Sequence, residues 1–227
     1  MRLQIVLLSF VLGAGLAQAS DQAPAPAAPL ASPERGPAGA KHVIVEYTDF
    51  GCPYCAKGAK TLDELREKYG ADLRIVFKPV PLKIATYAEA RMASQYFLAA
   101  TLQSMEKAWR LHDMMFANQS LIGDKYFYIK AAKVLGLDLS RLKADAEGDA
   151  VKGRLATDLD DFHRRGFTGV PVFMIGETVI MGASPIETFN AALNDGGAAP
   201  EQRADEKPAA AHAWYDEPSK TGSKETK

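Results

Sequence analysis

The chain has 227 residues, and its 27 lysines and arginines nearly balance its 28 aspartates and glutamates, which gives a formal net charge of −1 at pH 7. Charges of both signs are interspersed, so we expect no basic face that would bind nucleic acid or acidic lipid. The chain has two cysteines, Cys52 and Cys55, separated by two residues, which leaves no pair to join distant segments by a disulfide.

Residues 1–19 have the pattern of a secretory signal peptide. Arg2 supplies a positive charge, residues 3–16 form an apolar run, and small residues fit a cleavage site after Ala19. The apolar run is shorter than the roughly 20 residues that a membrane-spanning helix needs, so a retained anchor is the weaker interpretation. We therefore expect export to the periplasm or an equivalent oxidising compartment.

Two segments of biased composition flank the predicted domain. Residues 20–40 are mostly alanine and proline, which predicts an extended linker. Residues 196–227 are rich in alanine, proline, lysine and glutamate and poor in apolar residues, which predicts a disordered tail. The folded domain is therefore expected to span residues 41–195.

The first predicted elements are a strand, a helix and a second strand. Residues 43–47 are apolar and β-branched, which is typical of a buried strand. Apolar residues at three- and four-residue steps over 59–69 predict a helix that ends at Gly70. Residues 73–77 predict another strand, which nearby prolines terminate. The cysteine pair therefore lies between the first strand and the helix.

A helical block and a second group of strands follow. Residues 85–165 show helical periodicity without a strand pattern, which predicts a helical insertion. Residues 172–175 and 178–181 predict a β-hairpin, and residues 184–194 predict a final helix. The order β-α-β, helical insertion, β-β-α predicts an α/β fold.

The spacing of Cys52 and Cys55 indicates thiol–disulfide exchange. One thiolate attacks a disulfide, and a second thiol must lie close enough to resolve the resulting mixed disulfide. Cys52 is expected at the start of the helix, where unpaired backbone N–H groups and the helix dipole favour its thiolate. Pro53 suits the first helical position, Tyr54 completes the motif, and Cys55, one turn further, should be more buried.

Other interpretations of the cysteine pair are weaker. Zinc would need two more ligands, but the chain has no second cysteine pair and its four histidines are far apart, so no metal site is predicted. A disulfide between Cys52 and Cys55 closes too small a loop to stabilise the fold much. Methionine and cysteine both suit Cu(I), but the methionines are scattered as in core packing, so a copper-binding thiol protein stays an alternative.

Three motifs together resemble the DsbA-like thioredoxin family. Residues 45–55 read VEYTDFGCPYC, residues 77–82 precede the helical block, and residues 169–173 read GVPVF. The resemblance covers about residues 41–194. It implies a thioredoxin fold with an inserted helical subdomain, and a redox-active disulfide between Cys52 and Cys55 with no other cofactor.

The resemblance also implies roles for residues outside the cysteine motif. The proline opposite the active motif is cis in this family, which here is Pro171, and the Val170 backbone would pair with an extended substrate. Glu46 matches the buried acid of thioredoxin-like proteins, which can accept or relay a proton when Cys55 attacks. A surface carboxylate is the alternative for Glu46, and Lys78 is a candidate partner for its charge.

We therefore expect a periplasmic thiol–disulfide oxidoreductase that acts on unfolded or cysteine-containing exported proteins, as a dithiol oxidase. A membrane redox partner would reset its active site. Tyr54 leaves isomerase and reductase as alternatives, because related proteins with Pro-Tyr between the cysteines include both. Residues 20–40 show no heptad or amphipathic period, so we rank isomerase below oxidase and expect a monomer.

Overall fold

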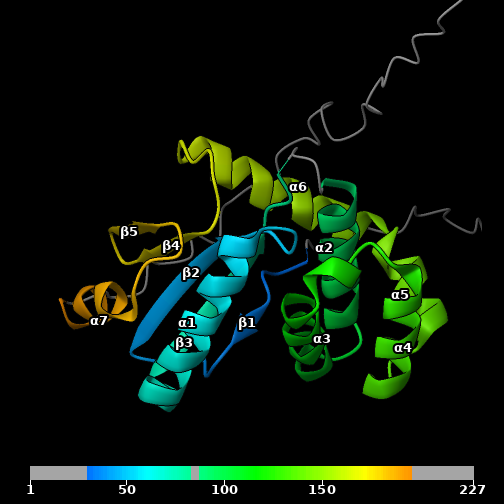
Figure 1. The fold of residues 1–227 in the computed structure, drawn as a ribbon, viewed down its shortest axis with the longest axis horizontal. Coiled ribbons are helices and arrows are strands. Elements are labelled where there is room, and N and C mark those ends of the chain that lie inside the picture. The colour runs from blue at the N-terminus through cyan, green and yellow to red at the C-terminus, as the bar shows by residue number, and fades with distance from the viewer. Residues whose placement is uncertain (1–29, 83–86, 196–227) are drawn as a thin grey trace, which may run out of the picture.

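The computed structural model describes residues 30–82 and 87–195. The predicted signal peptide with its cleavage site, the first part of the predicted linker and the predicted C-terminal tail lie outside these residues. Within them, one five-stranded sheet has the strand order β1-β3-β2-β4-β5 (Figure 1). None of the helices in these two ranges is long and apolar enough to cross a membrane.

The sheet is built around its central strand, β2 (His42–Thr48). This strand pairs in parallel with β3 (Leu73–Pro79) and antiparallel with β4 (Val172–Ile175). The short strand β1 (Glu34–Arg35) pairs antiparallel with β3 at one edge, and β5 (Thr178–Met181) forms the other edge beside β4. The two strand groups that the sequence predicts therefore join into one mixed sheet.

Helices cover the sheet and form a second lobe beside it. Helix α1 (Pro53–Tyr69) and the 3-10 turn η1 (Gly70–Asp72) connect β2 to β3, and α7 (Ile186–Asn194) follows β5. The lobe and the long helix α6 that runs from it across the sheet are visible in Figure 1. Their elements are α2 (Tyr87–Thr101), α3 (Met105–Ala117), η2 (Gln119–Leu121), α4 (Lys125–Leu135), α5 (Leu139–Ala146) and α6 (Asp149–Arg164). This confirms the thioredoxin fold with an inserted helical subdomain.

The central strand β2 is buried on both faces, and its side chains alternate between them. Ile44 packs in the larger core, which includes residues of α1, α7 and the helical insertion. Tyr47 points to the opposite face, where its ring centroid lies 5.8 Å from that of Phe162 on α6. Burying one such side chain stabilises the fold by about 1.5–3 kcal/mol. The two faces of β2 therefore belong to two separate clusters.

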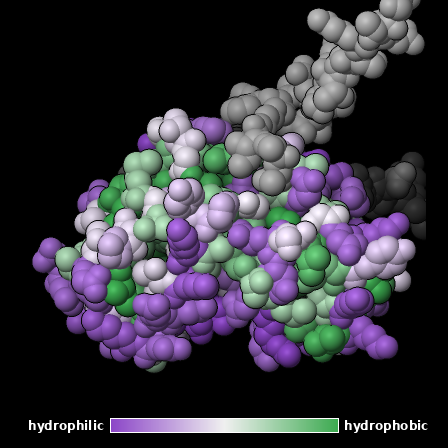
Figure 2. Space-filling model, in the orientation of Figure 1, coloured by the Kyte–Doolittle hydropathy of each residue, from purple (hydrophilic) through white to green (hydrophobic). Residues whose placement is uncertain are grey.

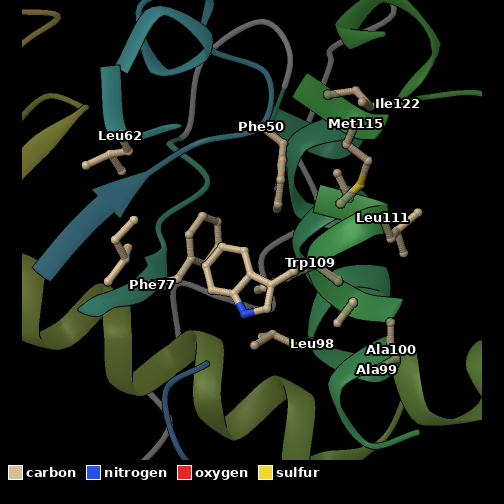
Figure 3. Close-up of a cluster of buried hydrophobic side chains, with 14 of the residues drawn as sticks. Phe50, Leu62, Phe77, Leu98, Ala99, Ala100, Trp109, Leu111, Met115 and Ile122 are labelled. Atoms are coloured by element: carbon tan, nitrogen blue, oxygen red, sulfur yellow. The ribbon is translucent and has the colours of Figure 1, made fainter. Parts of the chain in front are cut away.

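A cluster of aromatic side chains packs the helical insertion against the sheet. The ring of Phe77 on β3 lies 4.7 Å from Phe97 of α2 and 5.6 Å from Trp109 of α3. Phe50, in the loop after β2, lies 4.9 Å from Phe116 of α3. Phe50, Phe77 and Trp109 gather between the sheet and the insertion in Figure 3. Each such pair contributes about 0.5–1.5 kcal/mol beyond its burial, so the insertion is firmly packed.

The folded part begins earlier than the sequence predicts, so the expected linker over residues 20–40 is wrong for its described residues. The carbonyl of Glu34 on β1 accepts a hydrogen bond of 2.8 Å from the indole N–H of Trp109. Arg35 donates two hydrogen bonds to the carboxylate of Asp113, at 3.0 and 3.1 Å. These partners are at least 75 residues away along the chain, so local composition gave no sign of them.

A chain that begins at Lys41 should be less stable than one that begins at Leu30. The shorter chain loses β1 and leaves the buried Trp109 indole N–H without its acceptor. An unsatisfied buried donor costs about 1–3 kcal/mol. Thermal unfolding of the two chains measures the difference, and equal midpoints would show that β1 adds nothing to the stable fold.

Candidate active site

Cys52 is the N-cap of α1, directly after the loop that leaves β2. Its backbone is extended (φ −90°, ψ 121°), and Pro53 is the first residue of the helix, as the sequence predicts. The carbonyl of Cys52 accepts hydrogen bonds from the backbone N–H groups of Cys55 at 3.0 Å and Ala56 at 3.2 Å. Cys52 is 9% exposed and Cys55 is fully buried, with Tyr54 exposed beside them. The first cysteine therefore borders solvent and the second lies behind it.

The two thiols have opposite pKa shifts. A hydrogen bond from the Cys55 thiol, helped by the backbone N–H groups of Cys55 and Tyr54, lowers the pKa of Cys52 to about 6. Partial burial and the nearby Asp49 carboxylate oppose this shift without cancelling it. Burial, and the hydrogen bond that Cys55 donates to Cys52, raise the pKa of Cys55 far above its usual range. At neutral pH the pair is a thiolate in front of a protonated thiol.

Asp49 holds the loop between β2 and α1, a role that the sequence analysis missed. Its Oδ1 accepts a 2.7 Å hydrogen bond from the N–H of Gly51, and its Oδ2 accepts one of 2.9 Å from the N–H of Leu82. Its own N–H lies 3.4 Å from the sulfur of Cys55. Burial raises the pKa of Asp49, and the hydrogen bonds from these two backbone N–H groups only partly offset that rise. An aspartate two residues before a glycine is a typical Asx turn, a signal that could have identified it.

The peptide bond between Val170 and Pro171 is cis, in agreement with the family resemblance. The sulfur of Cys52 lies 3.8 Å from the carbonyl oxygen of Val170, although the two residues are 118 positions apart. Close packing of α1 on β4 brings them together: a Cβ at Gly58 would lie 2.7 Å from the ring of Phe173 and 3.5 Å from Pro171. The structure therefore places the predicted substrate-binding residues beside the predicted nucleophile.

Glu46 is buried beneath the active motif, at 1% exposure, which excludes the alternative of a surface carboxylate. Burial raises its pKa to about 8, and Thr48 partly opposes the shift. Thr48 also lowers the pKa of Cys55, so the three side chains share one buried region. Glu46 Oε1 and Thr48 Oγ1 have no hydrogen-bond partner of standard geometry among the described residues. At neutral pH the buried site therefore holds two protonated groups, the Glu46 carboxyl and the Cys55 thiol, and Thr48 influences the pKa of both.

Lys78 is not the partner of Glu46, so that expectation is wrong. Glu46 is paired in register with Phe77 on β3, whereas Lys78 is paired with Tyr47. Side chains of neighbouring residues point to opposite faces of a sheet, so Lys78 shares the face of Tyr47. There it forms a salt bridge with Asp161 of α6, which also accepts a hydrogen bond from the Tyr47 hydroxyl.

The family model for the DSBA-like thioredoxin domain matches residues 43–194, about two thirds of the chain. This chain belongs to the DSBA-like thioredoxin domain family. The catalytic domain of Proteus mirabilis ScsC is similar to it, with 26% identity and a TM-score of 0.63 over 74% of this chain and 90% of that one. The fold is also similar to that of a thioredoxin-like oxidoreductase from Silicibacter pomeroyi, at 22% identity and a TM-score of 0.62, over 72% and 91% of the two chains.

The curated relatives are much longer proteins. The Na(+)/H(+) antiporter NhaA of Herminiimonas arsenicoxydans is 33% identical over 159 residues, which are 70% of this chain and 24% of that protein. NhaA 3 of Salinispora tropica is 31% identical with the same coverage. This DSBA-like chain therefore spans about a quarter of the length of the curated relatives that it matches.

Cys55→Ala should raise the pKa of Cys52, because the hydrogen bond from the Cys55 thiol is the largest cause of its shift. Alkylation of the native chain should titrate with a midpoint near pH 6, and in Cys55→Ala the midpoint should move toward the 8.5 or so of a free cysteine. Cys55→Ser keeps a donor at this position and is the matched control, with a smaller shift. Equal midpoints in the two variants would contradict the assignment.

Glu46→Gln should change the dependence of stability on pH. The pKa of Glu46 is raised to about 8 in the fold, so its contribution is complete below about pH 4.5 and is lost as the pH rises through 8. At pH 7 the variant should be more stable by about 3 kcal/mol, since one pKa unit corresponds to roughly 1.4 kcal/mol. Urea unfolding at pH 5 and pH 8 measures this. If the free energy of unfolding of the variant depends on pH as that of the native chain does, the pKa of Glu46 is not raised by folding.

Proposed function

We propose that this chain is a thiol–disulfide oxidoreductase that exchanges disulfides with cysteine-containing proteins. One observation carries the proposal: the Cys52 thiolate lies at the start of α1, and the protonated thiol of Cys55 lies directly behind it. Such an arrangement supplies both the attacking sulfur and the resolving sulfur that exchange requires. The disulfide between these two residues would be the redox group, and the proposal needs no other cofactor.

The oxidising reaction balances with the groups of this site. A substrate thiolate attacks the sulfur of Cys52 in the oxidised enzyme, the bond between Cys52 and Cys55 breaks, and Cys55 leaves with the electron pair. A proton then restores the Cys55 thiol, and Glu46 is the proposed donor, because Thr48 influences the pKa of both buried groups. A second substrate thiolate attacks the substrate sulfur of the mixed disulfide and releases Cys52 as a thiolate. Two electrons pass from substrate to enzyme.

The lowered pKa of Cys52 favours the oxidase direction over the reductase direction. A stabilised thiolate is a good leaving group, and it also stabilises the reduced enzyme relative to the disulfide. An enzyme whose reduced form is favoured gives its disulfide to substrates. We therefore rank dithiol oxidase above isomerase and reductase.

We further propose that exchange takes place in the periplasm, with exported proteins as substrates and a membrane redox partner that resets the disulfide. The support is the signal-peptide pattern of residues 1–19. An extended substrate segment would pair with the backbone of Val170 beside Pro171, where the Cys52 sulfur is within 3.8 Å. The acting form is proposed to be a monomer.

Cys52→Ser should abolish exchange, because no attacking sulfur remains at the start of α1. Cys55→Ser cannot form the disulfide with Cys52 that oxidation of substrate requires. A mixed disulfide formed between Cys52 and a substrate disulfide then has no neighbouring thiol to release it, so such adducts should accumulate. Oxidative refolding of a reduced model protein measures turnover, and non-reducing gels reveal the trapped adducts. Full turnover by either variant would overturn the proposed function.

Measurements on the native chain separate the oxidase from the reductase, the isomerase and the copper-binding protein. Equilibration with glutathione buffers should give a reduction potential close to those of oxidising thioredoxin-like proteins, and a value near −270 mV would favour a reductase instead. Recovery of scrambled disulfides faster than oxidation of reduced chains would favour an isomerase. A copper-binding thiol protein should bind Cu(I) and fail in both insulin reduction and oxidative refolding.

A further inference from the structure

Gln119 connects the helical insertion to the active-site loop. This residue begins η2, which Asn118 separates from α3. Its Nε2 donates a hydrogen bond of 2.8 Å to the carbonyl of Phe50 and another of 2.9 Å to the carbonyl of Cys52. The partners are 69 and 67 residues away along the chain. One amide group of the insertion therefore holds two carbonyls of the segment that presents the reactive cysteine.

The rest of this segment is held from the thioredoxin side. The carboxylate of Asp49 binds the N–H of Gly51, and the carbonyl of Asp49 accepts a 3.0 Å hydrogen bond from the N–H of Cys52. The ring of Phe50 packs in the aromatic cluster, 4.9 Å from Phe116 of α3. Asp49 thus binds the N–H groups of the turn, and Gln119 of the insertion binds the carbonyls of Phe50 and Cys52. The Cys52 carbonyl also accepts from the first turn of α1, so the backbone of Cys52 is held from both α1 and the insertion.

We propose that Gln119 is a positioning residue for the exchange chemistry. This inference rests on the proposed function. The position of the Cys52 backbone decides whether its sulfur meets the Cys55 thiol and the N–H groups of α1, and these contacts lower its pKa. Gln119 holds that backbone by its carbonyl. Its amide group also offsets the partial negative charge of two carbonyl oxygens near the thiolate, and this favours the charged form of Cys52.

A hydrogen-bonding glutamine in the same insertion provides a matched control. Nε2 of Gln103 donates to the carbonyl of Asp138 at 3.0 Å, and the N–H of Asp138 donates to Oε1 of Gln103 at 2.8 Å. Gln103 therefore makes two hydrogen bonds to backbone groups, as Gln119 does, but within the helical lobe. Removal of either side chain should cost stability, and only removal of Gln119 should change the thiol chemistry.

The test compares Gln119→Ala, Gln119→Glu and Gln103→Ala in the full chain. Gln119→Ala should raise the alkylation midpoint of Cys52 and shift the equilibrium with glutathione toward the enzyme disulfide by about 3- to 10-fold, the range expected for one hydrogen bond. Gln119→Glu keeps the size of the side chain but replaces the donors by a carboxylate near the thiolate, so its shifts should be larger. Gln103→Ala should lower the unfolding midpoint and leave both thiol measurements unchanged.

Two results would overturn this proposal. The first is a Gln119→Ala variant with a lower unfolding midpoint but an unchanged Cys52 midpoint and glutathione equilibrium, which is the behaviour of a purely structural residue. The second is a Gln119→Glu variant that folds and has the thiol chemistry of the native chain. Failure of the proposed function is distinguishable, because then the native chain would not turn over substrate while the alkylation midpoint would still report on Gln119.

Discussion

The chemistry of this protein depends on the stabilisation of one sulfur by hydrogen bonds. The Cys52 thiolate is held by the Cys55 thiol and by backbone N–H groups of the first turn of α1, and together these outweigh burial and the charge of Asp49. Backbone donors at the start of a helix are fixed in place by the rest of the helix, so they stabilise an anion without having to reorganise. The same contacts keep Cys55 protonated, since it is the donor in the shared hydrogen bond.

The central strand β2 separates two buried acids, one ionised and one protonated. On the face toward α6, Asp161 is paired with Lys78 and accepts from Tyr47, so its pKa is lowered despite burial. On the face beneath the cysteines, burial raises the pKa of Glu46. The two faces of the sheet thus hold different groups. One face has the ion pair between Lys78 of β3 and Asp161 of α6, and the other has the protonated Glu46 of β2, because neighbouring residues of a strand point to opposite faces.

The helical insertion is part of the active site as well as of the core. Its aromatic side chains contact Phe50 and Phe77 from the sheet side (Figure 3). Its Gln119 donates hydrogen bonds to the loop that carries Cys52. Hydrophilic and hydrophobic residues are interspersed over the face in Figure 2, as the balanced charge of the sequence suggests.

The sequence by itself determined the elements of the thioredoxin fold, the extent of the helical insertion and the place of Cys52 before Pro53, because these follow from periodicity, helix-start signals and motif spacing within short windows. Tertiary structure decided what depends on distant pairing. The strand register separated Lys78 from Glu46, β1 found its partners in β3 and α3, and Gln119 reached the loop from 67 residues away. Such contacts are made by side chains and backbone groups that become neighbours only after folding, so local sequence patterns carry no record of them.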